Sequence, residues 1–230
     1  MNKKKSILVI AAHPDDELLG CGGTIARMSK EGHDISIAIL GEGITSRYLL
    51  REDADKKMIH NLYEHSNQVA KLLGAKNLQT FNLPDNRFDT IPLLDIVKIL
   101  ERYIEKIRPD CIYTHHSADL NLDHVLTNRA TLIATRPLEN SSVKTVLSYE
   151  VPSSTEWAFH TTGPGFQPNI FVDVTKTIDT KIEAMEIYDG ETREYPHPRS
   201  SESLRAIARR WGSVSGLKTA EAFELIRHIQ

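Results

Sequence analysis

The chain of 230 residues is poor in cysteine and has no marked excess of charge of either sign. Its two cysteines, Cys21 and Cys111, each lie in or beside an apolar segment, which favours two buried thiols over a disulfide. Because 28 Lys and Arg residues nearly balance 31 Asp and Glu residues, the charge gives no reason to expect nucleic acid as a partner. Ten histidines favour nitrogen and oxygen ligands at any metal site.

Long hydrophobic runs are also missing. No apolar stretch approaches membrane-spanning length, so we expect no membrane insertion. Three lysines precede a short apolar run near the N-terminus, but that run leads directly into a charged motif, which argues against a secretory signal peptide. A cytoplasmic location is therefore expected.

Strand-like and helix-like patterns alternate over the first part of the chain. Ser6–Ala11 is a nearly continuous apolar run, typical of a central strand covered on both faces, and Ile91–Ile107 has the apolar spacing of an amphipathic helix. The predicted strands are Ser6–Ala11, Asp34–Leu40, Leu78–Leu83 and Cys111–Thr114, and the predicted helices are Leu18–Glu31, Met58–Leu73, Ile91–Ile107 and Leu122–Thr135. Four such units in a row predict an α/β fold with a mostly parallel sheet and helices on both faces.

After Pro137 the alternation becomes looser. Two further strands are predicted at Thr145–Glu150 and Ile170–Val174, and three helices at Lys176–Tyr188, Ser201–Trp211 and Lys218–Ile229. This part is too short, and too interleaved with the strand pattern, to form a separate domain. We therefore expect a single domain over residues 1–230.

The most informative motif, His13-Pro14-Asp15-Asp16-Glu17, directly follows the first predicted strand. Its three carboxylates and one histidine are costly to place together unless a cation neutralises them. His13 and Asp16 are three residues apart across a turn and can reach one metal ion, while Asp15 can face a water molecule as a base. The alternative is an acidic helix N-terminus, which explains Glu17 but gives His13 no role.

A second polar group follows the fourth predicted strand, from His115 to His124. Because the carboxyl ends of parallel strands meet at one edge of a sheet, we expect both groups at the same edge. His124 then supplies a third ligand, and Asp123 beside it can orient an imidazole. Taken alone, Asp123-His124 would be explained better as a helix N-cap followed by a solvated histidine.

Other polar or glycine-rich features have two explanations each. The glycine-rich run at residues 20–23 resembles a dinucleotide loop, but close packing of a helix on the sheet explains it better after an acidic motif. Arg47 and Asp85 follow the second and third strands at the same edge of the sheet. We expect each of them either to contact substrate or to be an ordinary loop residue, with Asp85 capping a turn. Arg199 binds an acidic group of the substrate or pairs with Glu202.

The two motifs together resemble those of the PIG-L and LmbE-like family of zinc-dependent N-deacetylases. This family includes GlcNAc-phosphatidylinositol de-N-acetylases and the bacterial deacetylases of mycothiol and bacillithiol precursors. The resemblance covers most of the chain and is strongest at Ala12–Glu17, Leu19–Thr24 and Asp123-His124, with weaker likeness at Leu83–Arg87 and Tyr195–Ser200. It implies a Rossmann-like fold, one Zn²⁺ or another divalent metal ion per chain and Asp15 as the general base. The ligands that it implies are His13, Asp16 and His124.

The chain departs from this family at Asn121, where many relatives carry a histidine that stabilises the transition state. An amide can donate a hydrogen bond but cannot deliver a proton, so Asn121 is expected to contact substrate and another group must act as the acid. The candidates are His115, His116 and His197. We favour His197, because Pro196 and Pro198 stiffen the loop around it, although Asp15 could carry the proton alone.

The predicted function is a zinc-dependent hydrolase that removes the N-acetyl group from an amino sugar, releasing acetate and a free amine. The partner is a small N-acetylated sugar, free or linked to a nucleotide or another carrier. Whether the subunits form a homo-oligomer is left open. Two alternatives are a zinc hydrolase of a different amide or ester and a non-catalytic sugar- or metal-binding module. Asp15 argues against the second, because a binding site has little use for a free carboxylate beside the metal.

Overall fold

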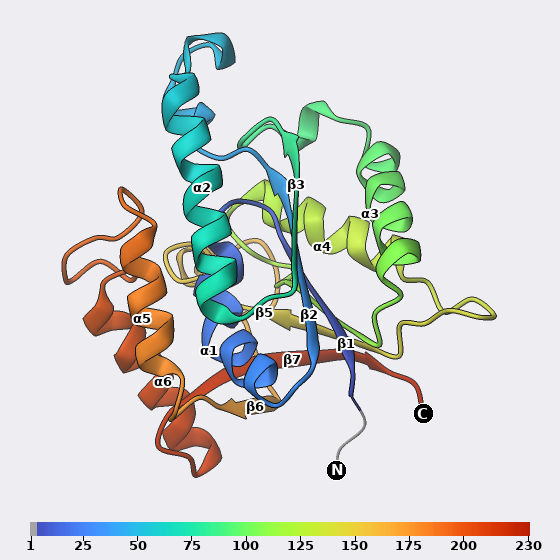
Figure 1. Cartoon of the computed structure of the whole chain (residues 1–230), viewed down its shortest axis with the longest axis vertical. Helices are drawn as coiled ribbons and strands as arrows, with labels where there is room; N and C mark the ends of the chain where they lie inside the picture. The colour runs from blue at the N-terminus through green and yellow to red at the C-terminus, as the bar shows by residue number, and fades with distance from the viewer. Residues whose placement is uncertain (1–3) are drawn as a thin grey trace.

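Within residues 4–230, which the computed structural model describes, seven strands form one sheet in the order β3-β2-β1-β4-β5-β7-β6 (Figure 1). The first of the three N-terminal lysines lies outside the described residues. The strands are β1 (Ser6–Ala11), β2 (Asp34–Gly41), β3 (Asn77–Leu83), β4 (Cys111–His115), β5 (Thr145–Tyr149), β6 (Ile170–Asp173) and β7 (Ala220–His228). The helices are α1 (Asp16–Lys30), α2 (Lys56–Leu73), α3 (Leu93–Ile107), α4 (Leu122–Ala134), α5 (Ile178–Ile187) and α6 (Ser201–Ser215). The connecting loops contain short 3₁₀ helices at Thr45–Arg47, Arg51–Asp53, Phe88–Thr90 and Glu156–Ala158.

The order of the strands reverses between β1 and β4. The chain moves outward from β1 through β2 to β3 and then returns, so that β4 pairs with β1 on its other side. All these pairings are parallel, and at such a reversal the loops after the two adjacent strands diverge and leave a crevice. His13 follows β1 and His124 lies beyond β4, so this crevice brings the two polar motifs together.

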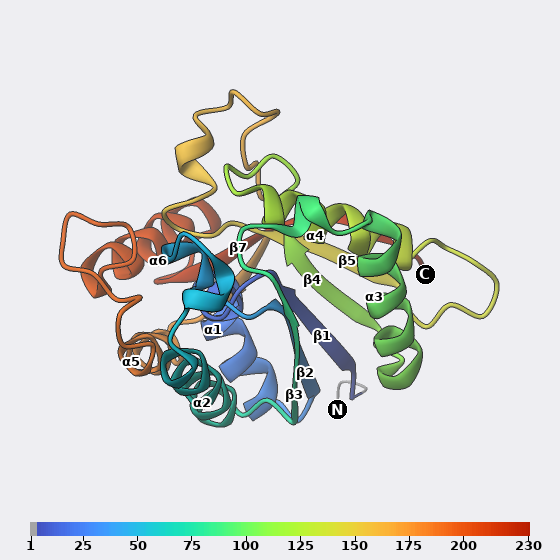
Figure 2. The same ribbon diagram turned by 90° about the horizontal axis from the view of Figure 1, so that it is seen from above.

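The alternation of side chains along β1 divides the core into two layers. Ile7 and Val9 pack with side chains of α1, α2 and α5, whereas Leu8 and Ile10 pack with side chains of α3 and α4. Figure 2 shows these two groups of helices on opposite faces of the sheet. Both faces are therefore covered, as the apolar run of β1 predicted.

Glycines of α1 allow that helix to pack closely against its neighbours. A Cβ atom at Gly20 would lie 2.2 Å from a ring carbon of Tyr149, and one at Gly23 would lie 2.8 Å from Cγ1 of Val174. No such carbon fits without displacement of the neighbour. The glycine-rich run thus serves helix packing, which is the explanation favoured from the sequence.

The predicted α/β fold with a mostly parallel sheet is confirmed, but the predicted C-terminal helix at residues 218–229 is wrong. This segment forms β7, which pairs antiparallel with both β5 and β6. Phe223 of β7 is fully buried and packs edge-on against Tyr113, with ring centroids 4.9 Å apart. The apolar spacing of the segment is compatible with a helix or a strand. It forms a strand because its backbone can hydrogen-bond to the edges of both β5 and β6.

Two expectations about composition have structural counterparts. Cys21 and Cys111 are buried free thiols, as predicted. None of the helices in residues 4–230 combines the length and the apolar composition that a membrane crossing requires.

Candidate metal centre and active site

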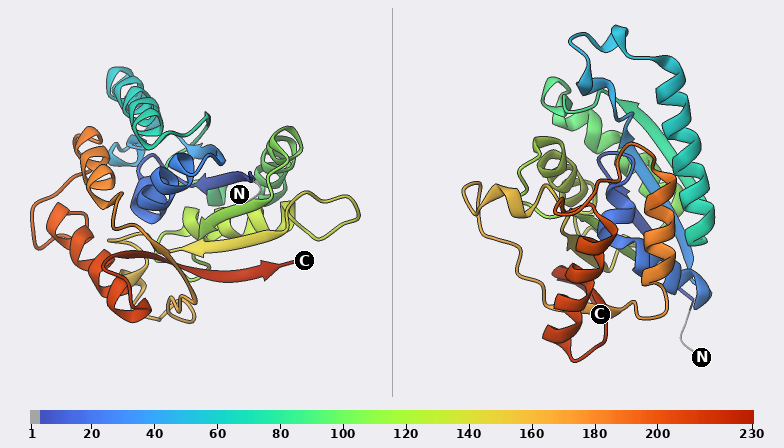
Figure 3. Two further views of the ribbon diagram at one scale, coloured as in Figure 1. Left: turned by 60° about the horizontal axis from the view of Figure 1, so that its bottom comes forward. Right: turned by 90° about the vertical axis from the view of Figure 1, so that its left-hand side faces the viewer.

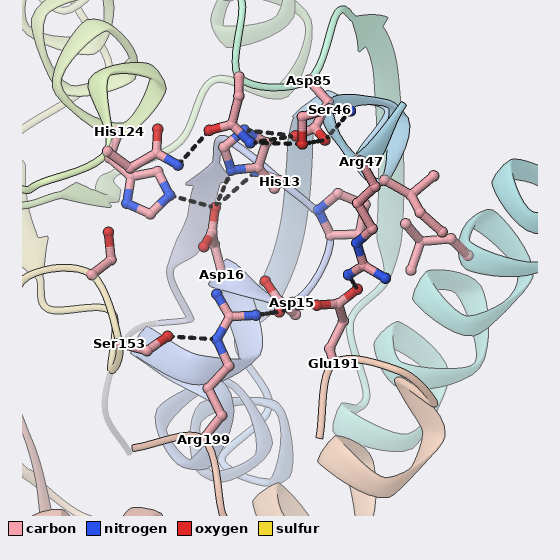
Figure 4. A pocket seen from close by; sticks show the side chains of 17 residues that line it. His13, Asp15, Asp16, Ser46, Arg47, Asp85, His124, Ser153, Glu191 and Arg199 are labelled. Atoms are coloured by element: carbon pink, nitrogen blue, oxygen red, sulfur yellow. Dashed lines mark hydrogen bonds and ion pairs between the residues drawn. The ribbon is translucent and has the colours of Figure 1, made fainter. Parts of the chain in front are cut away.

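His13, Asp16 and His124 form a cluster at the crevice between β1 and β4, with one potential ligand atom from each within 4.8 Å of the others. Nδ1 of His13 lies 3.4 Å, and Nε2 of His124 3.3 Å, from the same oxygen, Oδ2 of Asp16. Figure 4 shows Asp16 between the two imidazoles. The backbone N–H of His13 donates to that same oxygen over 2.8 Å, which fixes the carboxylate at the start of α1.

The outer nitrogen of each imidazole faces a second carboxylate. Nε2 of His13 is hydrogen-bonded to Oδ2 of Asp123 at 2.9 Å, and Nδ1 of His124 lies 3.2 Å from Oδ1 of Asp119. Such carboxylates favour an N–H on the outer nitrogen and leave the inner lone pair for a metal. Asp123 therefore lies on the imidazole of His13 and not on that of its neighbour His124. The contact between Asp119 and His124 was not predicted, because the sequence does not indicate which carboxylate lies beside His124.

The donor set of this cluster fits a divalent cation. Two imidazole nitrogens and one carboxylate oxygen converge there, and either a metal ion or protons on the imidazoles can supply the positive charge that the carboxylate attracts. Burial lowers the pKa of His124, but Asp16 and Asp119 outweigh burial and raise that pKa to about 9, so the cluster attracts positive charge. Two histidines and one carboxylate are a common catalytic zinc set that leaves coordination positions open. His13, Asp16 and His124 could thus hold a metal ion.

Asp15 lies beside the cluster and lines the same pocket. Its φ of 99° falls in the left-handed region, which is uncommon for a residue other than glycine. Its backbone N–H donates to Glu17, and its Oδ2 accepts a hydrogen bond from Nη1 of Arg199 at 2.6 Å. Burial raises the pKa of Asp15, and Arg199 opposes that rise. A carboxylate held in this way on a residue with strained backbone is typical of a functional site.

The pocket has a volume of about 230 Å³, and its wall is mostly polar. The four residues expected to contact substrate all line it, namely Arg47, Asp85, Asn121 and Arg199. Two of them also support the local structure. Oδ2 of Asp85 accepts hydrogen bonds from the N–H and the hydroxyl of Ser46, and Oδ1 of Asn121 caps α4 by accepting from the N–H of Asp123.

The described residues that line this pocket do not include the histidines considered as acids. Nε2 of His115 accepts a hydrogen bond from the N–H of Ala12 at 2.8 Å, and burial lowers the pKa of His115 well below its ordinary value. His115 is therefore a neutral side chain whose lone pair is already used. His116 is hydrogen-bonded through Nδ1 to Glu224 at 2.8 Å, and its other nitrogen contacts the carbonyl of Pro164.

His197 lies next to Arg199 but outside the pocket wall. Its Nδ1 accepts a hydrogen bond from the N–H of Arg199 at 3.1 Å, and its ring packs edge-on against Trp157. Burial lowers the pKa of His197, and Arg199 lowers it further. The loop thus directs Arg199, and not His197, towards Asp15.

Glu191 is a pocket residue that the sequence analysis did not identify. It accepts a hydrogen bond from Arg47, and its Oε2 lies 3.3 Å from Nη1 of Arg199. Glu191 follows α5 in an irregular segment without a motif, so no signal in the sequence could have assigned it to the site.

Comparison with known proteins defines the class to which this site belongs. Residues 8–135 match the family model PIG-L, described as GlcNAc-PI de-N-acetylase. The chain is 31% identical over 178 residues to the uncharacterized deacetylase YaiS of Escherichia coli strain K12, covering 75% of this chain and 84% of that protein. It is 24% identical over 244 residues to a diacetylchitobiose deacetylase of Thermococcus kodakarensis, covering 98% of this chain and 84% of that protein.

A solved structure with the same fold has another described activity. GalB, the 4-carboxy-2-hydroxymuconate hydratase of Pseudomonas putida, superposes with a TM-score of 0.77 at 20% identity, covering 98% of each chain. At this identity the likeness shows the fold alone.

The fold and the sequence matches together define a deacetylase family of enzymes. The chain belongs to the PIG-L family, and the resemblance deduced from its two motifs is confirmed. The matched residues 8–135 contain the whole His-Asp-His cluster and Asp15, whereas Glu191 and Arg199 lie beyond them.

Proposed function

We propose that this protein is a zinc-dependent N-deacetylase of an N-acetylated amino sugar, acting in the cytoplasm. The observation that carries the proposal is the position of Asp15, a buried carboxylate beside the metal-ligand cluster and on the wall of the same pocket. A non-catalytic binding module would have no role for a carboxylate placed there on a residue with strained backbone. The match to GlcNAc-PI de-N-acetylase and the similarity to a diacetylchitobiose deacetylase support a sugar substrate.

The side chains have distinct roles in this proposal. His13, Asp16 and His124 would hold a Zn²⁺ ion, which when bound polarises a carbonyl and lowers the pKa of water. Asp15 accepts the proton of the attacking water as the general base. Arg199 donates to Asp15 over 2.6 Å, so it orients that carboxylate and favours its ionised form against the effect of burial.

The leaving amine needs a proton, and we propose that Asp15 returns it. Water attack forms the new C–O bond and places one proton on Asp15, and transfer of that proton to the amine nitrogen as the C–N bond breaks restores the carboxylate. The products are acetic acid and the free amine, which at neutral pH become acetate and an ammonium group. His197 remains the alternative donor, but it lies outside the pocket wall and hydrogen-bonds to the backbone of Arg199. Asn121 lines the pocket and can donate a hydrogen bond to the developing oxyanion.

Acetate release tests the proposal. The zinc-loaded protein is assayed against N-acetylglucosamine, N,N′-diacetylchitobiose, simple N-acetyl amines and acetate esters. We expect the sugars to be the better substrates, and Asp15→Asn to retain metal and fold while losing about 10²–10⁴-fold in turnover. Preferred turnover of the esters or simple amides would instead indicate a different zinc hydrolase. Near-normal turnover by metal-loaded Asp15→Asn would reject Asp15 as the base.

A further inference from the structure

Glu191 lies between the two arginines of the pocket (Figure 4). It accepts a hydrogen bond from Nη2 of Arg47 on one side, and on the other its Oε2 lies 3.3 Å from Nη1 of Arg199. Nη1 of Arg199 also donates a hydrogen bond to Oδ2 of Asp15. Arg47, Glu191, Arg199 and Asp15 therefore form a row of alternating charges along one wall of the pocket. The side chain of Glu191 is 13% exposed and that of Arg199 21%, so their contact is largely shielded from water, whereas Arg47 is 45% exposed.

Among the described residues of the pocket wall, this row leaves no arginine or lysine without a carboxylate partner. Arg47 and Arg199 are the arginines of the pocket wall, and no lysine is present among the described residues that line it. Arg47 pairs with Glu191, and Arg199 pairs with both Glu191 and Asp15. Asp85 adds a further carboxylate at the same wall. Phosphate and carboxylate sites in proteins rely on guanidinium or ammonium groups that are available to the ligand.

An anionic group on the substrate would therefore meet an unfavourable electrostatic environment. It would either lie against the carboxylate of Glu191 or have to displace it from both arginines. Glu191 lies beyond residues 8–135, the part that matches the family model, so this arrangement is not contained in the segment that defines the family. A neutral sugar, in contrast, can hydrogen-bond to the paired arginines and to Asp85 through its hydroxyl groups.

We propose that this pocket selects an electrically neutral N-acetylated sugar over one that carries a phosphate or carboxylate, and that Glu191 is the specificity-determining residue. The inference rests on the proposed deacetylase function. It narrows the substrate class, because nucleotide-linked and phosphorylated sugars are then poor substrates.

The test compares two classes of substrate on the zinc-loaded wild-type protein. N-acetylglucosamine and N,N′-diacetylchitobiose represent the neutral class, and N-acetylglucosamine 6-phosphate and UDP-N-acetylglucosamine the anionic class. We expect kcat/KM to be at least about tenfold lower for the anionic compounds, the effect of about one unfavourable charge contact. Equal or preferred turnover of the anionic compounds overturns the inference and leaves the deacetylase function intact. Acetate release from neither class overturns both.

A variant that removes the negative charge of Glu191 tests the role of this residue. In Glu191→Gln, Arg47 loses its carboxylate partner, so the ratio of anionic to neutral kcat/KM should rise by about tenfold. Adding Arg47→Gln should cancel most of that rise. The matched control is Glu194→Gln, an equal charge change at an exposed residue of the same loop, and it should leave the ratio unchanged. An unchanged ratio in Glu191→Gln, or an equal rise in Glu194→Gln, contradicts the assignment.

Discussion

Arg199 donates a hydrogen bond of 2.6 Å to Asp15, although 184 residues separate the two in the chain. Nε of Arg199 also donates to the hydroxyl of Ser153 at 2.7 Å, so the guanidinium group is held from a second direction. Burial raises the pKa of Asp15, and Arg199 is the strongest influence that lowers it. The ionisation of the proposed base therefore depends on a residue from the far end of the sequence.

Replacing Arg199 should move the pH dependence of the reaction. Without the guanidinium, the pKa of Asp15 rises further, so the ionised base form appears only at higher pH. We expect Arg199→Met to shift the acid limb of kcat/KM to higher pH and to lower the rate at neutral pH. Arg199→Lys retains a positive charge and should shift the limb less. A pH–rate profile of Arg199→Met that overlays the wild-type profile would show that Arg199 does not tune the base.

Removing the carboxylates behind the imidazoles should weaken metal binding. Asp119→Asn and Asp123→Asn each remove one carboxylate that orients a ligand histidine, and such changes typically cost about 10–100-fold in metal affinity. Competition with a chelator measures the dissociation constant of Zn²⁺. Asp89→Asn, at an exposed position, serves as the control and should bind as the wild-type protein does. Unaltered affinity in both variants would mean that neither carboxylate supports the ligands.

His197→Ala separates the two proposed routes for the proton. Burial and the neighbouring Arg199 and Arg193 lower the pKa of His197, which disfavours the protonated ring that a proton donor needs. If Asp15 carries the proton, kcat and the alkaline limb of the profile remain near the wild-type values. A kcat at least about tenfold lower with intact metal content would identify His197 as the acid.

A buried ion pair behind α1 should contribute strongly to stability. Nζ of Lys181 lies 2.6 Å from Oε1 of Glu221, and Glu221 also accepts hydrogen bonds from the N–H groups of Gly23 and Thr24. Lys181→Met leaves a buried carboxylate without its counter-ion, which typically costs about 3–5 kcal/mol in the free energy of unfolding. Urea denaturation measures this loss. The double variant with Glu221→Gln should be less destabilised than Lys181→Met if the orphaned charge is the cause.

The dependence of stability on pH should change in Glu150→Gln. Burial raises the pKa of Glu150, whose carboxylate accepts a hydrogen bond from Nε1 of Trp211. Because the folded pKa is raised, this group favours folding below its ordinary pKa, and that contribution is lost as the pH rises through the raised value. Glutamine retains an acceptor for Trp211 without the charge. We expect the variant to have the higher Tm at about pH 8 and a similar Tm at about pH 4. Parallel Tm curves across this range would contradict the assignment.

The parallel part of the fold could be predicted because strand-like apolar runs such as Ser6–Ala11 alternate there with helix-like apolar spacing such as that of Ile91–Ile107. The segment at residues 218–229 could not, since its apolar residues suit either period. Its conformation is decided by partners that lie far away in the sequence, because β7 completes the ladders of β5 and β6. Local preference for a strand is weak compared with such pairing.

In the site, too, some residues could be predicted from the sequence and others could not. His13, Asp16 and His124 could be proposed because each lies just after a strand that ends at the crevice, and the topology alone brings such positions together. The partners Asp119, Glu191 and Arg199 depend on the paths of irregular loops. Arg199 could be suggested as a pocket residue, but its pairing with Asp15 could not be deduced, and Glu191 gave no signal. Loop geometry is set by many weak contacts, and one sequence does not encode them in a periodic pattern.

The position of β7 has a consequence for the order in which the protein can assemble during synthesis. Among the described strands β6 pairs with β7 alone, and Glu221 of β7 accepts hydrogen bonds from two backbone N–H groups of α1, the helix that begins with Asp16. In the left view of Figure 3, β7, in red, runs alongside β5, in yellow, a segment synthesised earlier. A nascent chain released only as far as residue 215 would contain every proposed metal ligand, yet α1 would lack this anchor. Assembly of the metal site should therefore follow synthesis of the last strand, although its ligands are synthesised in the first part of the chain.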